Sequence, residues 1–180
     1  MFKLLTVALV ATILAAGPVQ AQHQSQPYAT LKERPIKALS AEDIAGLRAG
    51  RGMAMALPAE LNRYPGPMHV LENETALGLT ASQKAVLEQQ VAAMREAAIS
   101  LGELIIARES ALEGQFRSGA ADAGTIDRLT SEIAVLYGQL RAVHLRTHLA
   151  TRATLTEPQL ATYQTLRGYE GSGASPPHKH

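Results

Sequence analysis

Two histidines four residues apart, His144 and His148, have the residue type and the spacing to bind a metal ion. Side chains at this spacing lie on one face of a helix, about one turn apart, so two neutral imidazole nitrogens can reach a single ion. His69 and Glu72, three residues apart in an upstream segment, are the candidates for the missing ligands. Zinc, nickel or copper suits such imidazole-rich ligation, and we expect no other cofactor.

The same histidines also fit an ordinary helix, because polar residues commonly line the edge of an apolar stripe. Leu145 takes the position of the catalytic glutamate in the H-E-x-x-H motif, so the pair lacks the base of a zinc hydrolase. The sequence contains neither a nucleophile elbow nor the G-x-x-x-x-G-K-[ST] loop that holds nucleotide phosphates. We therefore expect no enzymatic activity.

The composition narrows the class of protein. Among 180 residues, 17 Lys and Arg oppose 16 Asp and Glu, and cysteine is absent. This balance argues against a nucleic-acid-binding protein, which normally carries a basic excess, and the absence of cysteine excludes disulfides and thiolate metal sites. Only five Tyr, two Phe and no Trp are present, which favours helices over an aromatic-rich β-fold.

The N-terminal segment, residues 1–21, reads as a secretory signal peptide. Lys3 precedes an apolar run from Leu4 to Ala16, Gly17-Pro18 ends the run, and Val19-Gln20-Ala21 offers small residues for cleavage after Ala21. The alternative is an uncleaved anchor, but a membrane span needs about 20 apolar residues and this run is shorter. We expect a soluble protein outside the cytoplasm, with no stable membrane span.

The rest of the chain divides into four segments. Residues 22–39 are expected to form a flexible leader, and 170–180 a disordered tail rich in Gly, Ser and Pro. Residues 40–78 are expected to form short helices, with Ser40 as the first cap and further helices over Met53 to Leu61 and Met68 to Leu77. Residues 79–169 form the main helical domain.

A long antiparallel helical hairpin is the main prediction within 79–169. Between Thr80 and Phe116 apolar residues recur every seven positions in two interleaved sets, which is the pattern of helices packed along their length. A second apolar stripe begins at Ile126 and continues to about Thr154, followed by a short helix to Leu166. The connection between the stripes is short, so the two helices must fold back on each other. The expected seam residues are Leu87, Val91, Met94, Ala98, Leu101, Ile105 and Leu112.

A five-residue pattern, L-T-x-x-Q, opens the hairpin and recurs after it. In both copies the Thr hydroxyl can accept from the backbone N–H three residues on, while the Gln side chain reaches back to the Thr N–H. Each such capping box stabilises a helix by about 1 kcal/mol. The residues expected to form these caps are Leu79, Thr80, Gln83, Leu155, Thr156 and Gln159.

The paired L-T-x-x-Q motifs, the export signal and the hairpin between the motifs resemble the Spy/CpxP family of periplasmic proteins, a group that includes the zinc-responsive ZraP proteins. The resemblance spans Met68 to Tyr169, and His144 lies eleven residues before Leu155, as in the second motif of that family. It implies a periplasmic, all-α, cradle-shaped homodimer. It also implies an ATP-independent chaperone that binds unfolded client proteins, or a CpxP-like partner of a periplasmic sensor kinase.

A related group, the CnrX-like heavy-metal sensors, resembles the stretch around His144. Those proteins bind nickel, cobalt or zinc on the same hairpin, and His148 takes the place of their usual Met ligand. The leading hypothesis is therefore a periplasmic envelope-stress chaperone. The alternative is a periplasmic sensor or resistance protein for Zn, Ni, Co or Cu that uses His144 and His148. A third hypothesis is a structural envelope protein with neither activity.

Overall fold

The computed structural model describes residues 28–169, and within that range the chain is helical with no strand. The predicted all-α fold is therefore confirmed. The chain divides into two units, with the boundary between residues 32 and 33. The described part of the first is the short 3-10 helix η1 (Ala29–Leu31), and the second holds all the α-helices of the described range. The predicted signal peptide, the leader up to residue 27 and the tail 170–180 lie outside the described residues.

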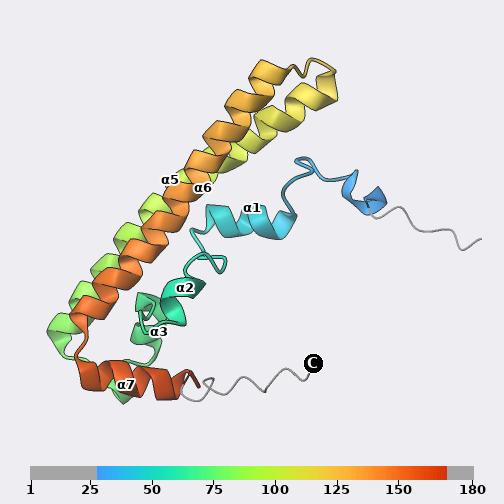
Figure 1. Ribbon diagram of the computed structural model, residues 1–180. Coiled ribbons are helices and arrows are strands. Elements are labelled where there is room, and N and C mark those ends of the chain that lie inside the picture. The colour runs from blue at the N-terminus through green and yellow to red at the C-terminus, as the bar shows by residue number, and fades with distance from the viewer. Residues whose placement is uncertain (1–27, 170–180) are drawn as a thin grey trace, which may run out of the picture. The chain divides into compact units, whose positions relative to one another are not determined.

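The second unit is built on α5 (Ala81–Ser118) and α6 (Ala123–Thr154), which run antiparallel along each other (Figure 1). The 38 residues of α5 give it a length of about 57 Å. Gly119, in the left-handed conformation, ends α5, and the Asp122 side chain accepts from the backbone N–H of Thr125 to begin α6. The predicted hairpin is confirmed.

Within residues 28–169, five shorter α-helices accompany this hairpin. They are α1 (Ala41–Arg48), α2 (Leu57–Glu60), α3 (Pro67–Glu72), α4 (Glu74–Leu77) and α7 (Glu157–Leu166). Helices α1 and α3 contact α5, α2 and α3 contact α6, and α4 contacts α7. Figure 1 shows α7 crossing the end of the hairpin at which α5 begins and α6 ends; we call this the basal end.

Two of the predicted short helices differ from the structure. The helix expected over Met53 to Leu61 is reduced to α2, because Met53 and Ala54 have positive φ angles of 43° and 61° that interrupt a right-handed helix. The helix expected over Met68 to Leu77 is split into α3 and α4 at Asn73, whose φ of −111° and ψ of 21° are not helical.

Among the described residues, the buried apolar side chains form two clusters. The middle cluster lies where α1 packs on the hairpin and contains Ile36, Leu39, Leu47, Ala98, Ile105, Ile106 and Leu140. The basal cluster joins α3, α4, α5 and α7 and contains Val70, Leu77, Leu87, Leu155, Leu160 and Tyr163. Each fully buried Leu contributes about 1.5–3 kcal/mol to the stability of the fold.

Residues 33–39, at the end of the expected leader, belong to the second unit. Ile36 and Leu39 are buried in the middle cluster, and the Lys37 ammonium lies 2.8 Å from the Glu113 carboxylate of α5. The prediction of a flexible leader is therefore wrong for residues 36–39. Two separated apolar residues in a polar segment carry no helical or strand period, so the sequence pattern could not place them in the core.

The packing of α1 on α5 depends on a glycine. A Cβ atom at Gly102 would lie 2.4 Å from the backbone oxygen of Leu47, so α1 can approach this closely only because position 102 has no side chain. Since residues two apart on a helix point about 200° apart, Leu104 lies on the side of α5 opposite α1.

Within residues 28–169, no helix is both long enough and apolar enough to span a membrane.

Candidate functional site

The two L-T-x-x-Q motifs form the capping boxes that the sequence predicts. Thr80 accepts from the backbone N–H of Gln83 at 3.2 Å, and the Gln83 side chain accepts from the Thr80 N–H at 3.0 Å. The same reciprocal pair joins Thr156 and Gln159, at 3.4 and 2.9 Å. The first box begins α5 and the second begins α7.

The two capping boxes also bind each other across the basal end. The Gln83 amide donates to the Gln159 side-chain oxygen at 2.8 Å and to the backbone oxygen of Thr154 at 2.9 Å. The Gln159 amide donates in return to the Gln83 side-chain oxygen at 3.1 Å and to the Leu77 oxygen at 3.3 Å. We call residues 79–83 and 155–159 together the motif clasp. It links the start of α5, the end of α6, α4 and α7.

A buried carboxylate, Glu60, is the centre of a second polar cluster. Only 5% of Glu60 is exposed, and its carboxylate accepts from the Gly66 backbone N–H at 2.9 Å. The hydroxyl of Tyr163 donates to the same carboxylate, and the hydroxyl of Tyr169 donates to it at 3.3 Å. Burial, together with the hydrogen bond to Glu60, raises the pKa of Tyr163 well above its ordinary value, so this hydroxyl stays a donor.

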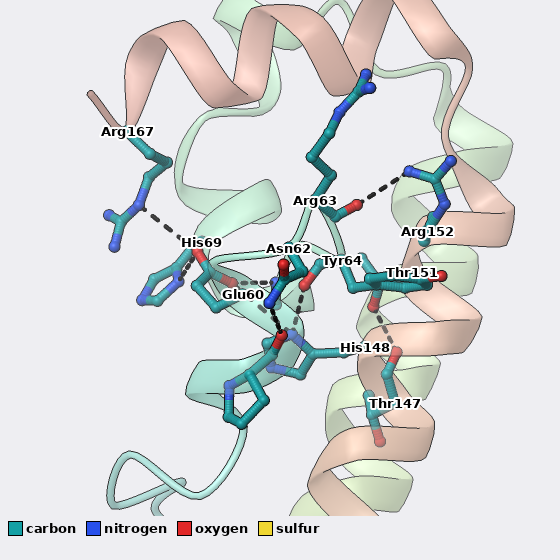
Figure 2. Close-up of polar contacts among 12 residues, drawn as sticks. Glu60, Asn62, Arg63, Tyr64, His69, Thr147, His148, Thr151, Arg152 and Arg167 are labelled. Carbon is teal, nitrogen blue, oxygen red and sulfur yellow. Dashed lines mark hydrogen bonds and ion pairs between the residues drawn. The ribbon is translucent and has the colours of Figure 1, made fainter. Parts of the chain in front are cut away.

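Three basic side chains converge on Glu60, as Figure 2 shows for the labelled residues. Nδ1 of His69 lies 3.5 Å and Nδ1 of His148 3.7 Å from the carboxylate, and Nε of Arg167 lies 3.8 Å from it. The Arg167 guanidinium, together with the hydrogen bonds from Gly66, Tyr163 and Tyr169, compensates a carboxylate that would be costly to bury alone. We call this cluster the Glu60 hub: Glu60, Gly66, His69, His148, Tyr163, Arg167 and Tyr169.

His148 is held in one tautomer by its surroundings. Its Nδ1 lies 2.7 Å from the backbone oxygen of Tyr64 (Figure 2). A carbonyl oxygen only accepts, so Nδ1 carries the proton and Nε2 is the lone-pair nitrogen of the neutral ring. Gly66 lies against this edge of the ring, since a Cβ there would be 3.3 Å from Nε2.

His144 lies deeper than the sequence pattern indicates. Only 3% of the residue is exposed, and its Nε2 is buried with no hydrogen-bond partner among the described residues. Burial lowers the pKa of His144, and the neighbouring His148 lowers it further. His144 is therefore a neutral imidazole with an uncommitted nitrogen, the protonation state that a metal ligand requires.

The four predicted metal ligands are only partly brought together. His69 and His148 meet at Glu60, which sequence reasoning missed, whereas Glu72 is exposed and takes no part in the Glu60 hub. Within residues 28–169, no group of three or more His, Asp or Glu side chains is arranged to hold a metal ion. The signal for Glu60 was its charge within the apolar stretch from Met53 to Leu61, an arrangement typical of a buried, paired group.

A third feature lies away from the basal end, on the side of the hairpin that α1 does not cover. A shallow groove runs between α5 and α6, with Leu104 and Val135 exposed by 46% and 58%. An ion pair at 2.7 Å between Arg108 and Glu132 lies in the same groove. Its lining residues are Leu104, Arg108, Ser131, Glu132, Val135, Leu136 and Gln139.

Comparison of the chain with protein-family models, with curated proteins and with solved structures found no match.

Proposed function

We propose that this protein is an exported, periplasmic chaperone of the Spy/CpxP type, which binds unfolded client proteins without ATP. The observation that carries the proposal is the groove between α5 and α6, where Leu104 and Val135 present apolar surface on a helical face that no other described helix covers. Soluble proteins that expose apolar patches commonly use them to bind other proteins. The L-T-x-x-Q pair, on which the resemblance rests, supports the same assignment.

The groove suits weak and reversible binding. It is shallow and open, so a client segment would bury limited apolar area and would leave by mass action. Arg108 and Glu132 place one positive and one negative group beside the apolar side chains, so both acidic and basic client segments find a partner there. Such mixed chemistry favours the binding of many different client sequences over the recognition of one particular sequence.

We include a homodimer in the proposal. The helical cradle implied by the family resemblance needs two hairpins, and Phe116 near the hairpin turn is exposed by 60%, so it offers apolar surface to a second copy. Sedimentation velocity of the mature chain tests this, with a dimer expected at micromolar concentration. A monomer at all accessible concentrations would contradict it.

The chaperone assignment is tested by light scattering of an aggregating client, with the mature chain added at one dimer per client. Leu104→Ser with Val135→Ser should weaken suppression of aggregation at least fivefold, because these changes remove the apolar surface of the groove. The matched control is Leu57→Ser with Met68→Ser, which removes two exposed apolar side chains of α2 and α3. No suppression by the wild type, or equal loss in both double variants, would contradict the proposal.

A periplasmic metal sensor or metal-resistance protein is the second candidate. Two observations favour it: His144 has a buried, unpartnered Nε2, and His148 offers Nε2 as its lone-pair nitrogen. Both nitrogens suit Zn, Ni, Co or Cu, and Glu60 or His69 would supply the further ligand after a local rearrangement. A metal-loaded form would then signal to a periplasmic partner.

Calorimetric titration with zinc, nickel, cobalt and copper tests the second candidate. His144→Ala should abolish micromolar binding, whereas the matched control, His178→Ala with His180→Ala, removes two histidines of the C-terminal tail and should leave it intact. Unchanged binding in His144→Ala, or its loss in the tail variant, would place the metal elsewhere.

A further inference from the structure

A polar pocket beside α7 is used by neither proposed function. It lies between the segment that follows α2 and the outer side of α7, with a volume of about 560 Å³. This is within the range of small-molecule sites and larger than a phosphate or a carboxylate group alone. Its lining residues are Leu61, Asn62, Arg63, Ala161, Gln164 and Tyr169.

Gln164 is a donor without a partner. The residue lines the pocket and is 7% exposed, and its side-chain nitrogen is buried with no hydrogen-bond partner among residues 28–169. Leaving a buried amide donor unpaired costs free energy, and such groups in native proteins often serve a ligand. An acceptor bound in the pocket, after a small rotation of the amide, would satisfy it.

Arg63 is held in a strained conformation at the same pocket. Its φ of 67° lies in the left-handed region that non-glycine residues rarely adopt. Its backbone oxygen accepts from Arg152 at 3.0 Å, and its guanidinium lies only 3.5 Å from the exposed Glu157. The backbone N–H of Tyr64 donates to the Ala59 oxygen at 3.0 Å, so Arg63 is the left-handed residue of the turn that ends α2, and this turn fixes the point from which its side chain leaves the backbone.

Three arginines lie at or near the pocket, and Glu157 is the acidic partner of two of them. Arg63 lines the pocket, and Arg152 lies beside it and donates to Glu157 at 3.2 Å. Arg167 stacks on the Tyr169 ring at 5.7 Å. None of the six lining residues is acidic, and the carboxylate of Glu60 is committed to its hub. Arginine and amide donors together are the groups that bind oxyanions in proteins.

We propose that this pocket binds a ligand carrying an anionic oxygen group, a carboxylate or a phosphate, with Arg63 as the charged partner and Gln164 as a neutral donor. Arg63 would exchange its long contact with Glu157 for a direct bond to the ligand. Asn62, whose amide donates to the backbone oxygen of Pro58 at 2.7 Å, marks the rim of the site.

The test follows the side-chain amide NMR signals of Gln164 and Asn62 in the mature chain during two titrations at constant ionic strength. One uses inorganic phosphate and the other uses acetate. Saturable shifts of the Gln164 amide are expected, and the anion that binds more tightly identifies the ligand class. The absence of a saturable shift with both anions would overturn the proposal.

Two variants and one control separate a site from general charge attraction. Arg63→Gly removes the guanidinium and suits the left-handed backbone, so it should fold and weaken binding at least tenfold. Gln164→Met, of similar size, should weaken binding about fivefold without lowering the melting temperature, because it removes an unpaired donor. Arg146→Gln, on the exposed surface of α6, should bind as the wild type does. Equal weakening by Arg63→Gly and Arg146→Gln, or wild-type affinity in Arg63→Gly, would overturn the proposal.

Discussion

The basal end and the distal half of the hairpin are stabilised in different ways. All four buried polar side chains of the described residues, Glu60, His144, Thr151 and Gln164, lie toward the basal end. In the distal half, the part of the hairpin nearer the turn between α5 and α6, no residue between Ile106 and Leu129 is fully buried. Charged groups there form partly exposed pairs, such as those of Arg108 and Arg128 with Glu132.

The difference follows from the number of helices that meet in each region. At the basal end α4 and α7 close over α5 and α6, so polar groups are enclosed and must be paired internally. Two helices alone enclose few side chains, Leu129 and Ile133 among them, so the distal half relies on its apolar seam and on ion pairs that water screens. We infer that the distal half opens more readily and that the basal end fixes the arrangement of the short helices.

The largest expected effect comes from removing the centre of the Glu60 hub. Glu60→Leu leaves the Tyr163 hydroxyl and the Gly66 N–H without an acceptor. It also removes the carboxylate that lies 3.8 Å from Arg167. The free energy of unfolding should therefore fall by about 3–5 kcal/mol. Urea unfolding followed by circular dichroism measures this. The matched change in the distal half of α5, Glu103→Leu, removes only the exposed pair with Arg48 and should leave the midpoint near that of the wild type. Equal losses in the two variants would show that the regions do not differ as described.

The next effect concerns two glycines of the same helix. Gly102→Ala would put a Cβ 2.4 Å from the Leu47 backbone, so α1 must move and stability should fall by about 1–3 kcal/mol. Gly114→Ala, in the distal half, meets no atom within 4 Å and should gain up to about 1 kcal/mol from helix propensity. Thermal unfolding of both variants provides the measurement. The same sign in both would contradict the close packing of α1.

A smaller effect is expected in the motif clasp. Gln83→Ala and Gln159→Ala should each cost about 1 kcal/mol, because each removes one half of a capping box and one side of the amide pair. In a double-mutant cycle the two losses should be coupled by about 0.5 kcal/mol or more. Gln139→Ala, an exposed glutamine of the distal half, is the control and should be close to neutral. Strict additivity of the two basal changes would show that the boxes act only as separate caps.

The sequence predicts those parts of the fold that depend on local signals. The hairpin was predicted because apolar periodicity and capping residues act within one helix, and the predicted helix over Thr80 to Phe116 matches α5 to within about two residues at each end. The break at Asn73 and the left-handed Met53 and Ala54 were not predicted, because packing against the hairpin overrides weak local preferences there.

The candidate site was less predictable because it joins distant positions. His144 and His148 were recognised by their spacing, but the partner of His148 is Glu60, separated from it by 88 positions in the sequence. The two L-T-x-x-Q motifs were recognised as caps, whereas their contact with each other depends on how α7 folds back over α5. A single sequence, read without related sequences, carries no signal for contacts between residues this far apart beyond the residue types themselves.

At neutral pH the smallest effect expected is that of His144 protonation, which changes the stability of the basal end only as the pH falls. Because burial lowers the pKa of this imidazole in the folded chain, the unfolded chain binds the proton first as the pH falls below about 6.5. Stability should therefore decrease between about pH 6.5 and the lower folded pKa, by at most about 1.4 kcal/mol per pH unit for one proton, and this contribution should vanish above pH 7.

His144→Leu removes this proton uptake, so the variant should gain stability over the wild type as the pH is lowered from 7 to 5. The measurement is urea unfolding at several pH values in the presence of EDTA, since a bound metal would itself keep the ring neutral. Carboxylates with a lowered pKa, such as Asp43 and Asp122, lose their contribution to stability only below about pH 4. Both proteins contain these carboxylates, so their effect cancels when the stability of the wild type is subtracted from that of the variant. A difference that stays constant over this range would mean that His144 is solvated in the folded chain, and the basal end would then lack the dry interior that distinguishes it from the distal half.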